Sequence, residues 1–595
     1  MIRSAIVSVR EKMKQCGMFA YLVPTSDFHS SEYVGEHFKT RAFLSGFTGS
    51  AGTLVVTQQE AGLFVDGRYF LQAGQQLECS GIDLYKLGEP GVPTVNEFIE
   101  RVMPENSVLG MDGRTVTAAI GDQLKQLLAG KNITFATERD LVDEIWTDRP
   151  PISDKKAFLL DIRYTGMSAA DKLAQLRADM ANMDAYAHVI TTLDDIMWLF
   201  NIRGGDIEDT PAALCYAVIE AEKAYLFIDE CKLTDEVKAA LSGINVEFLP
   251  YNGVYAFVSR YKGKRVLLCR NKVNLALCMQ LADAAEIIDR ENPTVLKKAI
   301  KNPTELANLR EIHIADGVAV ARTMHYIKQN IGKQPLSELG VAAFIEGERA
   351  KIVDAMGPSF DTICGYGPHG AIVHYSATPK SDAVLLPESF LLLDSGGQYL
   401  RGTTDITRTI ALGPLTQQQK KHFAMVLRSM LNLAAAKFLY GCSGMNLDIL
   451  ARAPFWDEGL DYNHGTGHGV GYLSGVHEAP NGFRWKKSPA RDEEAVLQEG
   501  MVTTDEPGVY IENEYGIRLE NELICIKDEE NGFGQFMRFE NLTFAPIDLD
   551  ALDVSLLSEI ERARLNDYHA QVYEKLSAYM HPDELVWLRE YTRAV

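Results

Sequence analysis

Two segments in the first half of the chain are weak copies of each other, and this repeat is the feature that most constrains the fold. "FAYLVPTSD" around Tyr21 resembles "DAYAHVITTLD" around Tyr186, which lies 165 residues later. "LFVDGRYF" around Asp66 resembles "LFIDECKL" around Asp229, which lies 163 residues later. These offsets are far longer than the roughly 20–50 residues of a solenoid repeat. The pattern predicts two copies of one α/β domain, and the second copy lacks the Gly-Arg-Tyr-Phe that follows Asp66.

Two further features predict where the domains meet. The polar stretch "TDRPPISDKK" (147–156) contains paired prolines, which are typical of a linker. At the second boundary Asn302, Pro303 and Glu305 form a capping box with proline at the first helical position, so a helix is expected to begin there. A chain of 595 residues has room for about three or four domains of roughly 150 residues. We therefore expect domains at 1–152, 153–301 and 302–595.

The third segment mixes strand-like and helical patterns. "SFLLLDSGG", "DITRTIALG" and "YGIRLENELICI" read as strands. Thr416 and Gln419 form another capping box, which predicts the start of a helix. The tail from Val554 is expected to be helical and is a candidate oligomer contact.

Composition excludes several classes of protein. The net charge of −22 argues against binding to nucleic acid or to anionic membranes. The nine cysteines include no C-x-x-C pair, which argues against a disulfide framework or a structural zinc site. The N-terminal stretch has no apolar signal core, and no run of roughly 18 apolar residues predicts a membrane span. We expect a cytoplasmic protein.

The stretch "YNHGTGHGVGYLSGVHEAP" concentrates three histidines, His464, His468 and His477. On a helix, His464 and His468 would share one face, as in zinc peptidases. Each interspersed glycine, however, costs a helix roughly 1 kcal/mol relative to alanine. The histidines are therefore expected on irregular or extended backbone.

Four carboxylates lie in or beside apolar, strand-like runs of the same segment. A single acid in such a place is usually an ordinary solvated edge residue. If the four converge, their charge of about −4 must be relieved by protons or by cations, and two divalent ions would balance it. Four carboxylates and one imidazole form a hard donor set that suits Mn, Co or Fe. The spacing leaves open whether these residues converge: Asp394, Asp405, Glu506 and Glu520.

The motifs "DSGGQYLRGTTDITRT", "NHGTGHGVG", "TDEPG" and "GIRLEN" resemble those of the pita-bread metallopeptidases, which include methionine aminopeptidase, prolidase and aminopeptidase P. With "SEYV", "RAFLSGFTGSAGT" and "DGRYFLQA" near the N-terminus, the resemblance is to the long, three-domain aminopeptidases P of the cytosol, over essentially the whole chain. It implies an α/β chain with two creatinase-type domains followed by a pita-bread catalytic domain. It also implies five metal ligands: Asp394, Asp405, His468, Glu506 and Glu520.

The resemblance further implies the activity and its other residues. The protein is expected to release the N-terminal residue from peptides with proline in second position. It is expected to use two divalent metal ions, with Mn²⁺ favoured, Co²⁺ second and Zn²⁺ less suited, and to form a homodimer. Catalytic roles are expected for His374, His464 and His477. Substrate contacts are expected for Arg68, His374, His464, His477 and Arg518, of which Arg518 could instead hold Glu520.

The sequence leaves three alternatives. Prolidase shares the ligand set but usually has one N-terminal domain and cuts only dipeptides. Creatinase shares the catalytic fold but lacks the metal ligands. A non-enzymatic, protein-binding relative would typically have lost ligands, and this chain keeps all five.

Overall fold

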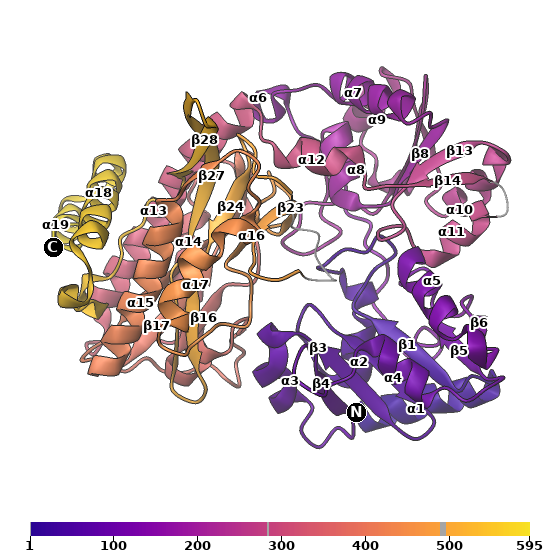
Figure 1. Ribbon diagram of the computed structural model, residues 1–595, viewed down its shortest axis with the longest axis horizontal. Helices are drawn as coiled ribbons and strands as arrows, with labels where there is room; N and C mark the ends of the chain where they lie inside the picture. Colours follow the sequence, from indigo (N-terminus) through magenta and orange to yellow (C-terminus); the bar gives the residue numbers. More distant parts are fainter. Residues whose placement is uncertain (1, 283–284, 488–494) are drawn as a thin grey trace. The chain divides into compact units, whose positions relative to one another are not determined.

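The computed structural model describes residues 2–282, 285–487 and 495–595, which form two compact units (Figure 1). The first unit comprises 1–162 and 167–294. The second comprises 163–166 and 295–595.

The first unit contains two six-stranded sheets. The first sheet has the order β4 (Asp83–Lys86), β3 (Ala61–Val65), β2 (Thr53–Thr57), β1 (Ala20–Pro24), β5 (Val108–Met111) and β6 (Thr134–Ala136). The second has the order β12 (Val246–Leu249), β11 (Ala224–Phe227), β10 (Tyr216–Glu220), β8 (Ala187–Ile190), β13 (Arg265–Leu268) and β14 (Glu286–Asp289).

The two sheets have the same topology strand for strand. In each, the first strand pairs antiparallel with the second and parallel with a later strand, as β1 does with β2 and β5 and β8 does with β10 and β13. The outer pairs β3–β4 and β11–β12 are both parallel. The predicted duplication is therefore confirmed by the order and direction of the strands.

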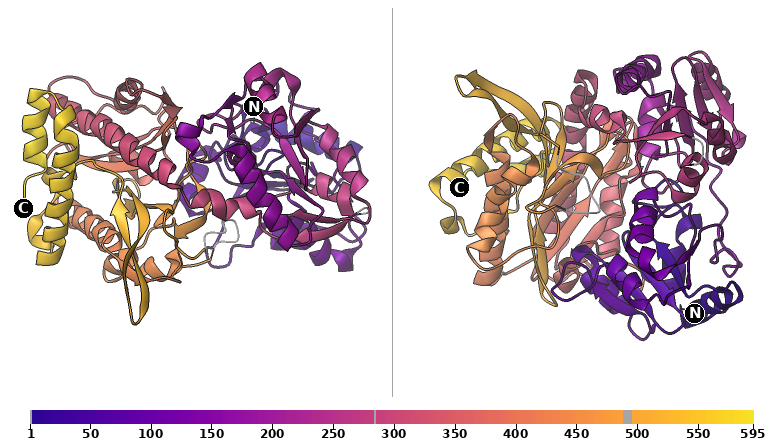
Figure 2. Two further views of the ribbon diagram at one scale, coloured as in Figure 1. Left: turned by 90° about the horizontal axis from the view of Figure 1, so that it is seen from above. Right: turned by 45° about the vertical axis from the view of Figure 1, so that its right-hand side comes forward.

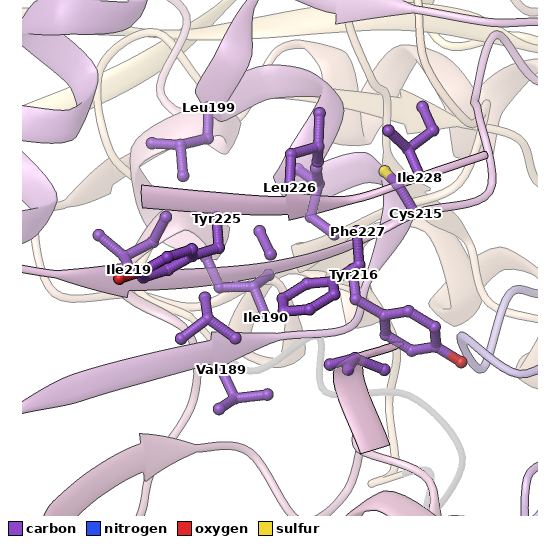
Figure 3. Packing of buried hydrophobic residues seen from close by; sticks show 14 of the residues in the cluster. Val189, Ile190, Leu199, Cys215, Tyr216, Ile219, Tyr225, Leu226, Phe227 and Ile228 are labelled. Atoms are coloured by element: carbon purple, nitrogen blue, oxygen red, sulfur yellow. The ribbon is translucent and has the colours of Figure 1, made fainter. Parts of the chain in front are cut away.

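Each sheet is covered on both faces, as expected where strands are almost wholly apolar. In β1, Tyr21 and Val23 point to one hydrophobic core, and Ala20 and Leu22 point to another, because successive side chains alternate. In the second copy, residues from β8, β10 and β11 pack into one large core, as Figure 3 shows for Ile190, Tyr216 and Leu226. The helices of this unit are α1 (Ile2–Gln15), α2 (Thr40–Ser45), α3 (Phe70–Gln76), α4 (Val95–Val102), α5 (Ala118–Leu127), α7 (Ala169–Asn182), α8 (Leu193–Phe200), α9 (Asp235–Ser242), α10 (Gly253–Phe257) and α11 (Leu275–Ala282).

Two short helices lie where the chain passes between the units, α6 (Ile162–Thr165) and α12 (Pro293–Ala299). A small two-stranded sheet joins β7 (Phe158–Leu159) to β9 (Ile202–Arg203).

The second unit is built around small antiparallel sheets. One contains β16 (Ile363–Tyr366), β17 (Phe390–Ser395) and β20 (Ile406–Ala411), and another β15 (Ala355–Pro358), β18 (Gly397–Tyr399) and β19 (Gly402–Thr403). The largest has the order β21 (Lys437–Leu439), β28 (Gly534–Asn541), β27 (Asn521–Asn531), β24 (Val502–Asp505), β22 (Gly467–Gly469) and β23 (Glu478–Phe483). A hairpin joins β25 (Gly508–Ile511) to β26 (Tyr515–Arg518).

Two helices of this unit begin where the sequence predicts. Asn302 caps α13 (Pro303–Asn330) in a capping box with Glu305, and Thr416 caps α15 (Gln417–Ala434) in a box with Gln419. Both predictions are confirmed. The remaining helices are α14 (Glu338–Arg349), α16 (Gly444–Leu447), α17 (Ile449–Trp456), α18 (Glu559–Leu576) and α19 (Pro582–Tyr591).

The C-terminal tail is helical, as predicted from Val554 onward, although α18 itself starts at Glu559. Helix α18 packs against α13 and α15, and α19 packs against α13 (Figure 2). Leu565, Tyr568, Val572 and Leu576 are buried in the core of the unit. One face of the tail therefore stabilises its own chain. Among the described residues, no helix combines the length and the hydropathy that a membrane span requires.

A candidate metal centre

The five predicted ligands come from strand ends that meet in the second unit. Asp394 on β17 lies opposite Thr407 on β20, and Asp405 directly precedes β20. His468 is the central residue of β22, and Glu506 directly follows β24. Glu520 lies between β26 and β27. One ligand atom each of Asp405, His468 and Glu520 lies within 4.8 Å of the other two.

Hydrogen bonds fix several of these side chains and their backbones. Thr407 donates from Oγ1 to Glu520 Oε2 at 2.8 Å. The backbone N–H of Glu506 donates to the carbonyl of Thr466 at 2.7 Å. Glu506 is the most exposed of the five, with 18% of its side chain accessible, whereas the Glu520 side chain is almost fully buried.

The ring orientation of His468 leaves one nitrogen for a ligand. Its Nδ1 lies 2.9 Å from the carbonyl of Gly469, which can only accept, so Nδ1 carries the proton. Its Nε2 lies 3.4 Å from Asp405 Oδ2 and 3.7 Å from Glu506 Oε1. In neutral His468 this nitrogen presents a lone pair toward two carboxylates, an arrangement that requires a proton or a cation between them.

The glycines beside His468 allow its strand to approach its neighbours closely. A Cβ atom on Gly467 would lie 1.8 Å from the carbonyl oxygen of Thr504, and one on Gly469 would lie 2.2 Å from that of Glu478. Both distances are far shorter than any contact between non-bonded atoms, so only glycine fits at these two positions. The prediction of extended rather than helical backbone for this stretch is confirmed.

The clustered charges shift the pKa values of the ligands. Burial, together with the charges of Asp394 and Glu506, raises the pKa of Asp405 to about 7, although His468 opposes the shift. Burial and the neighbouring carboxylates also raise the pKa of Glu520. Burial lowers the pKa of His468, but Asp405 and Glu506 outweigh it and raise that pKa to about 9. The metal-free site therefore takes up protons where cations would otherwise balance its charge.

These residues fit divalent cations that prefer oxygen and nitrogen ligands. Asp394 Oδ1 and Asp405 Oδ1 are both buried and have no hydrogen-bond partner within the described part of the chain. Buried carboxylate oxygens normally have partners. Two such oxygens, in a cluster that also holds the Nε2 lone pair of His468, fit a site for cations.

Beside the cluster runs a chain of hydrogen bonds that ends at His464. Arg518 donates from Nη2 to Asp394 Oδ2 at 2.6 Å and from Nη1 to the Tyr510 hydroxyl at 2.6 Å. The Tyr510 hydroxyl lies 2.8 Å from His464 Nε2. Because His464 Nδ1 donates to the carbonyl of Gly465, its Nε2 accepts from Tyr510. Burial and the charge of Arg518 hold the pKa of His464 well below its usual value, so the ring is neutral.

The other predicted residues lie in different surroundings. The His477 ring meets the His468 ring edge to face, with centroids 4.3 Å apart. His374 follows Val373, whose carbonyl accepts a hydrogen bond from Arg518. Arg518 is 2% exposed and donates to Asp394, and Glu520 is also among the charges that raise its pKa.

Arg68 belongs to the first unit. Its guanidinium donates to Asp66 at 2.9 Å through Nε and at 2.8 Å through Nη2, and its Nη1 lies 3.5 Å from Glu32. Only 14% of its side chain is accessible.

Sequence reasoning missed Tyr510, although a signal for it exists. "PGVYIENEYGIRLE" folds as the hairpin β25–β26, in which Gly508 pairs with Arg518. Tyr510 stands two residues from Gly508 on the same face, as a diagonal neighbour of Arg518. Recognising this hairpin in the sequence would have placed a tyrosine beside the arginine.

The raised pKa values predict how pH affects the metal-free protein. Asp405 titrates at about 7 in the folded state and near about 3.9 in the unfolded state. The folded protein binds more protons between these values, so its free energy of unfolding should fall as pH rises through this range. The raised pKa of His468 acts in the same direction between about 6.5 and 9.

The measurement is the melting temperature in chelator at about pH 5 and about pH 7.5, with and without Mn²⁺. We expect the stabilisation by Mn²⁺ to be larger at the higher pH, because the ligands must be deprotonated to bind it. A stabilisation that shrinks with rising pH would contradict this account.

Comparison with known proteins assigns each part of the chain to a family model. Residues 6–145 and 148–305 each match a creatinase/prolidase N-terminal domain. Residues 307–527 match metallopeptidase family M24, and residues 535–595 match the C-terminal region of that peptidase family. The predicted fold class, two creatinase-type domains followed by a pita-bread catalytic domain, is confirmed.

Relatives extend this similarity over the whole chain. The chain is 38% identical to "Probable Xaa-Pro aminopeptidase P" of Laccaria bicolor, over 98% of this chain and 92% of that protein. It is 38% identical to "Aminopeptidase P2" of Arabidopsis thaliana, over 94% and 84%. A crystal structure of X-prolyl aminopeptidase from Caenorhabditis elegans, described as a cytosolic enzyme with a di-nuclear active site, is 33% identical, covers 100% of both chains and has a TM-score of 0.95.

Proposed function

The chain belongs to the aminopeptidase P group of metallopeptidase family M24, and we propose that it releases the N-terminal residue from peptides whose second residue is proline. The observation that carries the proposal is the meeting of Asp394, Asp405, His468, Glu506 and Glu520 in one buried site. The activity is that of an Xaa-Pro aminopeptidase, a hydrolase. The full-length similarity favours this activity over that of a prolidase.

We propose that the same five residues hold two divalent metal ions. When bound, such ions supply Lewis acidity and neutralise charge during peptide hydrolysis. The donor set of four carboxylates and one imidazole favours Mn²⁺, with Co²⁺ as the second choice. Thr407 orients Glu520, Arg518 orients Asp394, and the carbonyl of Gly469 orients His468.

Two of the other histidines are proposed to act on the scissile bond. His374 and His477 donate hydrogen bonds to the carbonyl oxygen of the residue before proline, and these bonds strengthen as that oxygen gains negative charge. A protonated imidazole can also return a proton to the departing proline nitrogen. His464, whose Nε2 accepts from Tyr510, is proposed to hold Tyr510 and Arg518 in place at the edge of the substrate site.

Product analysis with three peptides tests the activity. The metal-reconstituted protein is expected to release arginine from Arg-Pro-Pro and to leave Arg-Ala-Pro intact, because only the former has a tertiary amide at the first peptide bond. Arg-Pro-Pro distinguishes the enzyme from a prolidase, which would cut the dipeptide Ala-Pro and leave this tripeptide intact. Release of arginine from Arg-Ala-Pro at a similar rate would contradict proline specificity.

Oligomeric state and location are further parts of the proposal. We propose a cytoplasmic homodimer, supported for the location by the similarity to an enzyme described as cytosolic. Light scattering of the purified protein would give twice the chain mass of 66.1 kDa if the dimer is stable. A monomer at all concentrations would contradict this part alone.

A role for Arg68 in substrate binding is also proposed, on the strength of the "DGRYF" motif that the second copy lacks. Asp66 and Glu32 hold the guanidinium in a fixed position. Arg68→Ala is expected to lower kcat/KM by about 10- to 150-fold, the equivalent of a charge-assisted hydrogen bond of roughly 1.5–3 kcal/mol. The loss should be larger for a pentapeptide than for a dipeptide.

The control for this variant is Arg114→Ala, because Arg114 pairs with Asp112 in the same unit and with similar geometry. Metal content should remain unchanged in both variants. Unchanged kcat/KM with both peptides in Arg68→Ala would show that Arg68 has only a structural role.

A further inference from the structure

A single buried carboxylate gathers the segment that carries His374. Glu338 is the first residue of α14 and is fully buried. Its Oε1 accepts hydrogen bonds from the backbone N–H of Tyr366 and from His369 Nδ1, both at 2.8 Å. Its Oε2 accepts from the Tyr375 hydroxyl at 2.9 Å and from the backbone N–H of Ala383 at 3.1 Å.

The four donors come from the start, the middle and the end of one segment, residues 366–383. Between β16 and β17 this segment contains only one 3-10 turn, Gly367–Ala371, and no strand or α-helix. Backbone groups here therefore lack the regular ladders that stabilise strands and helices. The carboxylate of Glu338 takes their place as the common acceptor.

The side chains around Glu338 reinforce this arrangement. The His369 and Tyr375 rings stack with centroids 4.5 Å apart and an angle of 23° between their planes. The Asp382 side chain accepts from the backbone N–H of Leu339 at 3.0 Å, which ties the end of the segment to the same helix terminus. The negative charge of Glu338 is also favoured at the N-terminus of α14 by the helix dipole.

The segment in turn contacts the groups that hold the metal ligands. The carbonyl of Val373, next to His374, accepts from Arg518, and Arg518 also holds Asp394. The backbone of Gly370 packs against Gly516, where a Cβ would lie only 1.7 Å from the Gly370 oxygen. A shift of the segment would therefore displace His374, whereas Arg518 would keep its direct bond to Asp394.

We propose that Glu338 is a positioning residue for the reaction, and that it sets the place of His374 through His369 and Tyr375. This inference rests on the proposed function, because it concerns how His374 reaches the substrate. Glu338 itself does not touch the reacting atoms. Residues 366–383 form an active-site loop whose geometry depends on one buried charge.

The principal test is Glu338→Gln, which keeps the shape of the side chain but turns one acceptor into a donor that faces existing donors. For Arg-Pro-Pro we expect kcat to fall by about 10- to 100-fold, because small displacements of a positioning group cost that much. KM and the affinity for Mn²⁺, measured by titration, should stay near the wild-type values. Amide hydrogen exchange should accelerate within 366–383 and remain unchanged in β22 and β24.

A second variant guards against misfolding of the first. His369 is partly exposed, with 32% of its side chain accessible, so its replacement should be tolerated by the fold. His369→Leu removes one donor to Glu338 and should lower kcat by a smaller factor than Glu338→Gln. His369→Asn, whose amide can donate to the same oxygen, should restore most of the loss.

The matched control is Glu561→Gln. Glu561 is also a buried carboxylate in the first turn of a helix, and it accepts from Ser558 and Arg428, away from the site. Its replacement should lower the melting temperature but leave kcat unchanged. Wild-type kcat in both Glu338→Gln and His369→Leu would overturn the inference, whereas an inactive wild-type protein would contradict the proposed function.

Discussion

Replacement of Asp405 with asparagine is expected to lower kcat/KM for Arg-Pro-Pro by at least about 10³-fold, because the metal ions supply several kcal/mol of stabilisation in the transition state. The variant should also bind less metal, as measured by elemental analysis after reconstitution with Mn²⁺. Asparagine keeps the shape of the side chain but removes the charge that would bind the cations. Two tightly bound ions and full activity in Asp405→Asn would contradict the assignment of this ligand.

The same substitution should stabilise the metal-free protein. Removing one of several crowded, buried carboxylates relieves their repulsion, so the melting temperature in chelator should rise above that of the wild type. Asp548→Asn is the matched control, because Asp548 is equally buried but paired with Lys328 and with the backbone N–H of Ala411. That change should destabilise the protein and leave its metal content unchanged, because it breaks a buried ion pair.

The second large effect is expected for His477. His477→Ala should lower kcat by roughly 10²-fold or more, because it removes a donor that acts on the charge developing in the transition state. Metal content should remain near that of the wild type, since His468 supplies the imidazole ligand. The variant loses the edge-to-face contact between the two rings. The His468 backbone should nevertheless stay in place, because its N–H donates to the Thr504 hydroxyl.

Matched variants separate the roles of the histidines. His468→Ala should lose both metal and activity, and His569→Ala, at a buried histidine bonded to the backbone of Ile547, should lose only stability. If His477→Ala loses metal instead, the division of roles among the three histidines is wrong.

Several features of the fold could be predicted because local sequence determines them. The duplicated domains share apolar strands whose spacing survives where identity is weak, and both sheets keep the same order. The capping boxes at Asn302 and Thr416 depend only on residues three apart. The glycines around His468 excluded a helix and left extended backbone.

The convergence of the ligands could not be derived from spacing. Asp394 and Asp405 meet because β17 and β20 pair around the small sheet of β18 and β19, and Glu520 reaches them through Thr407. The bond between Thr407 and Glu520 joins residues 113 positions apart, and only the resemblance to a family pointed to this convergence. The structure supplies the distances that the sequence lacked.

Glu338 illustrates a role that sequence patterns hide. A glutamate in the first turn of a helix is ordinary, and its charge is usually explained by the helix dipole alone. Its four hydrogen bonds become visible only when the segment from Tyr366 to Ala383 is folded around it. Arg518 is similar, since the sequence placed it near Glu520 and the structure shows it bound to Asp394.

The measurement that tests the central claim most directly is the anomalous diffraction of crystals grown from protein reconstituted with Mn²⁺. The account predicts two anomalous peaks per chain, both within coordination distance of side chains among Asp394, Asp405, His468, Glu506 and Glu520. It also predicts that treatment with chelator removes both peaks and abolishes the release of arginine from Arg-Pro-Pro. Full activity of a protein whose crystals show no anomalous peak at these five residues would contradict the account.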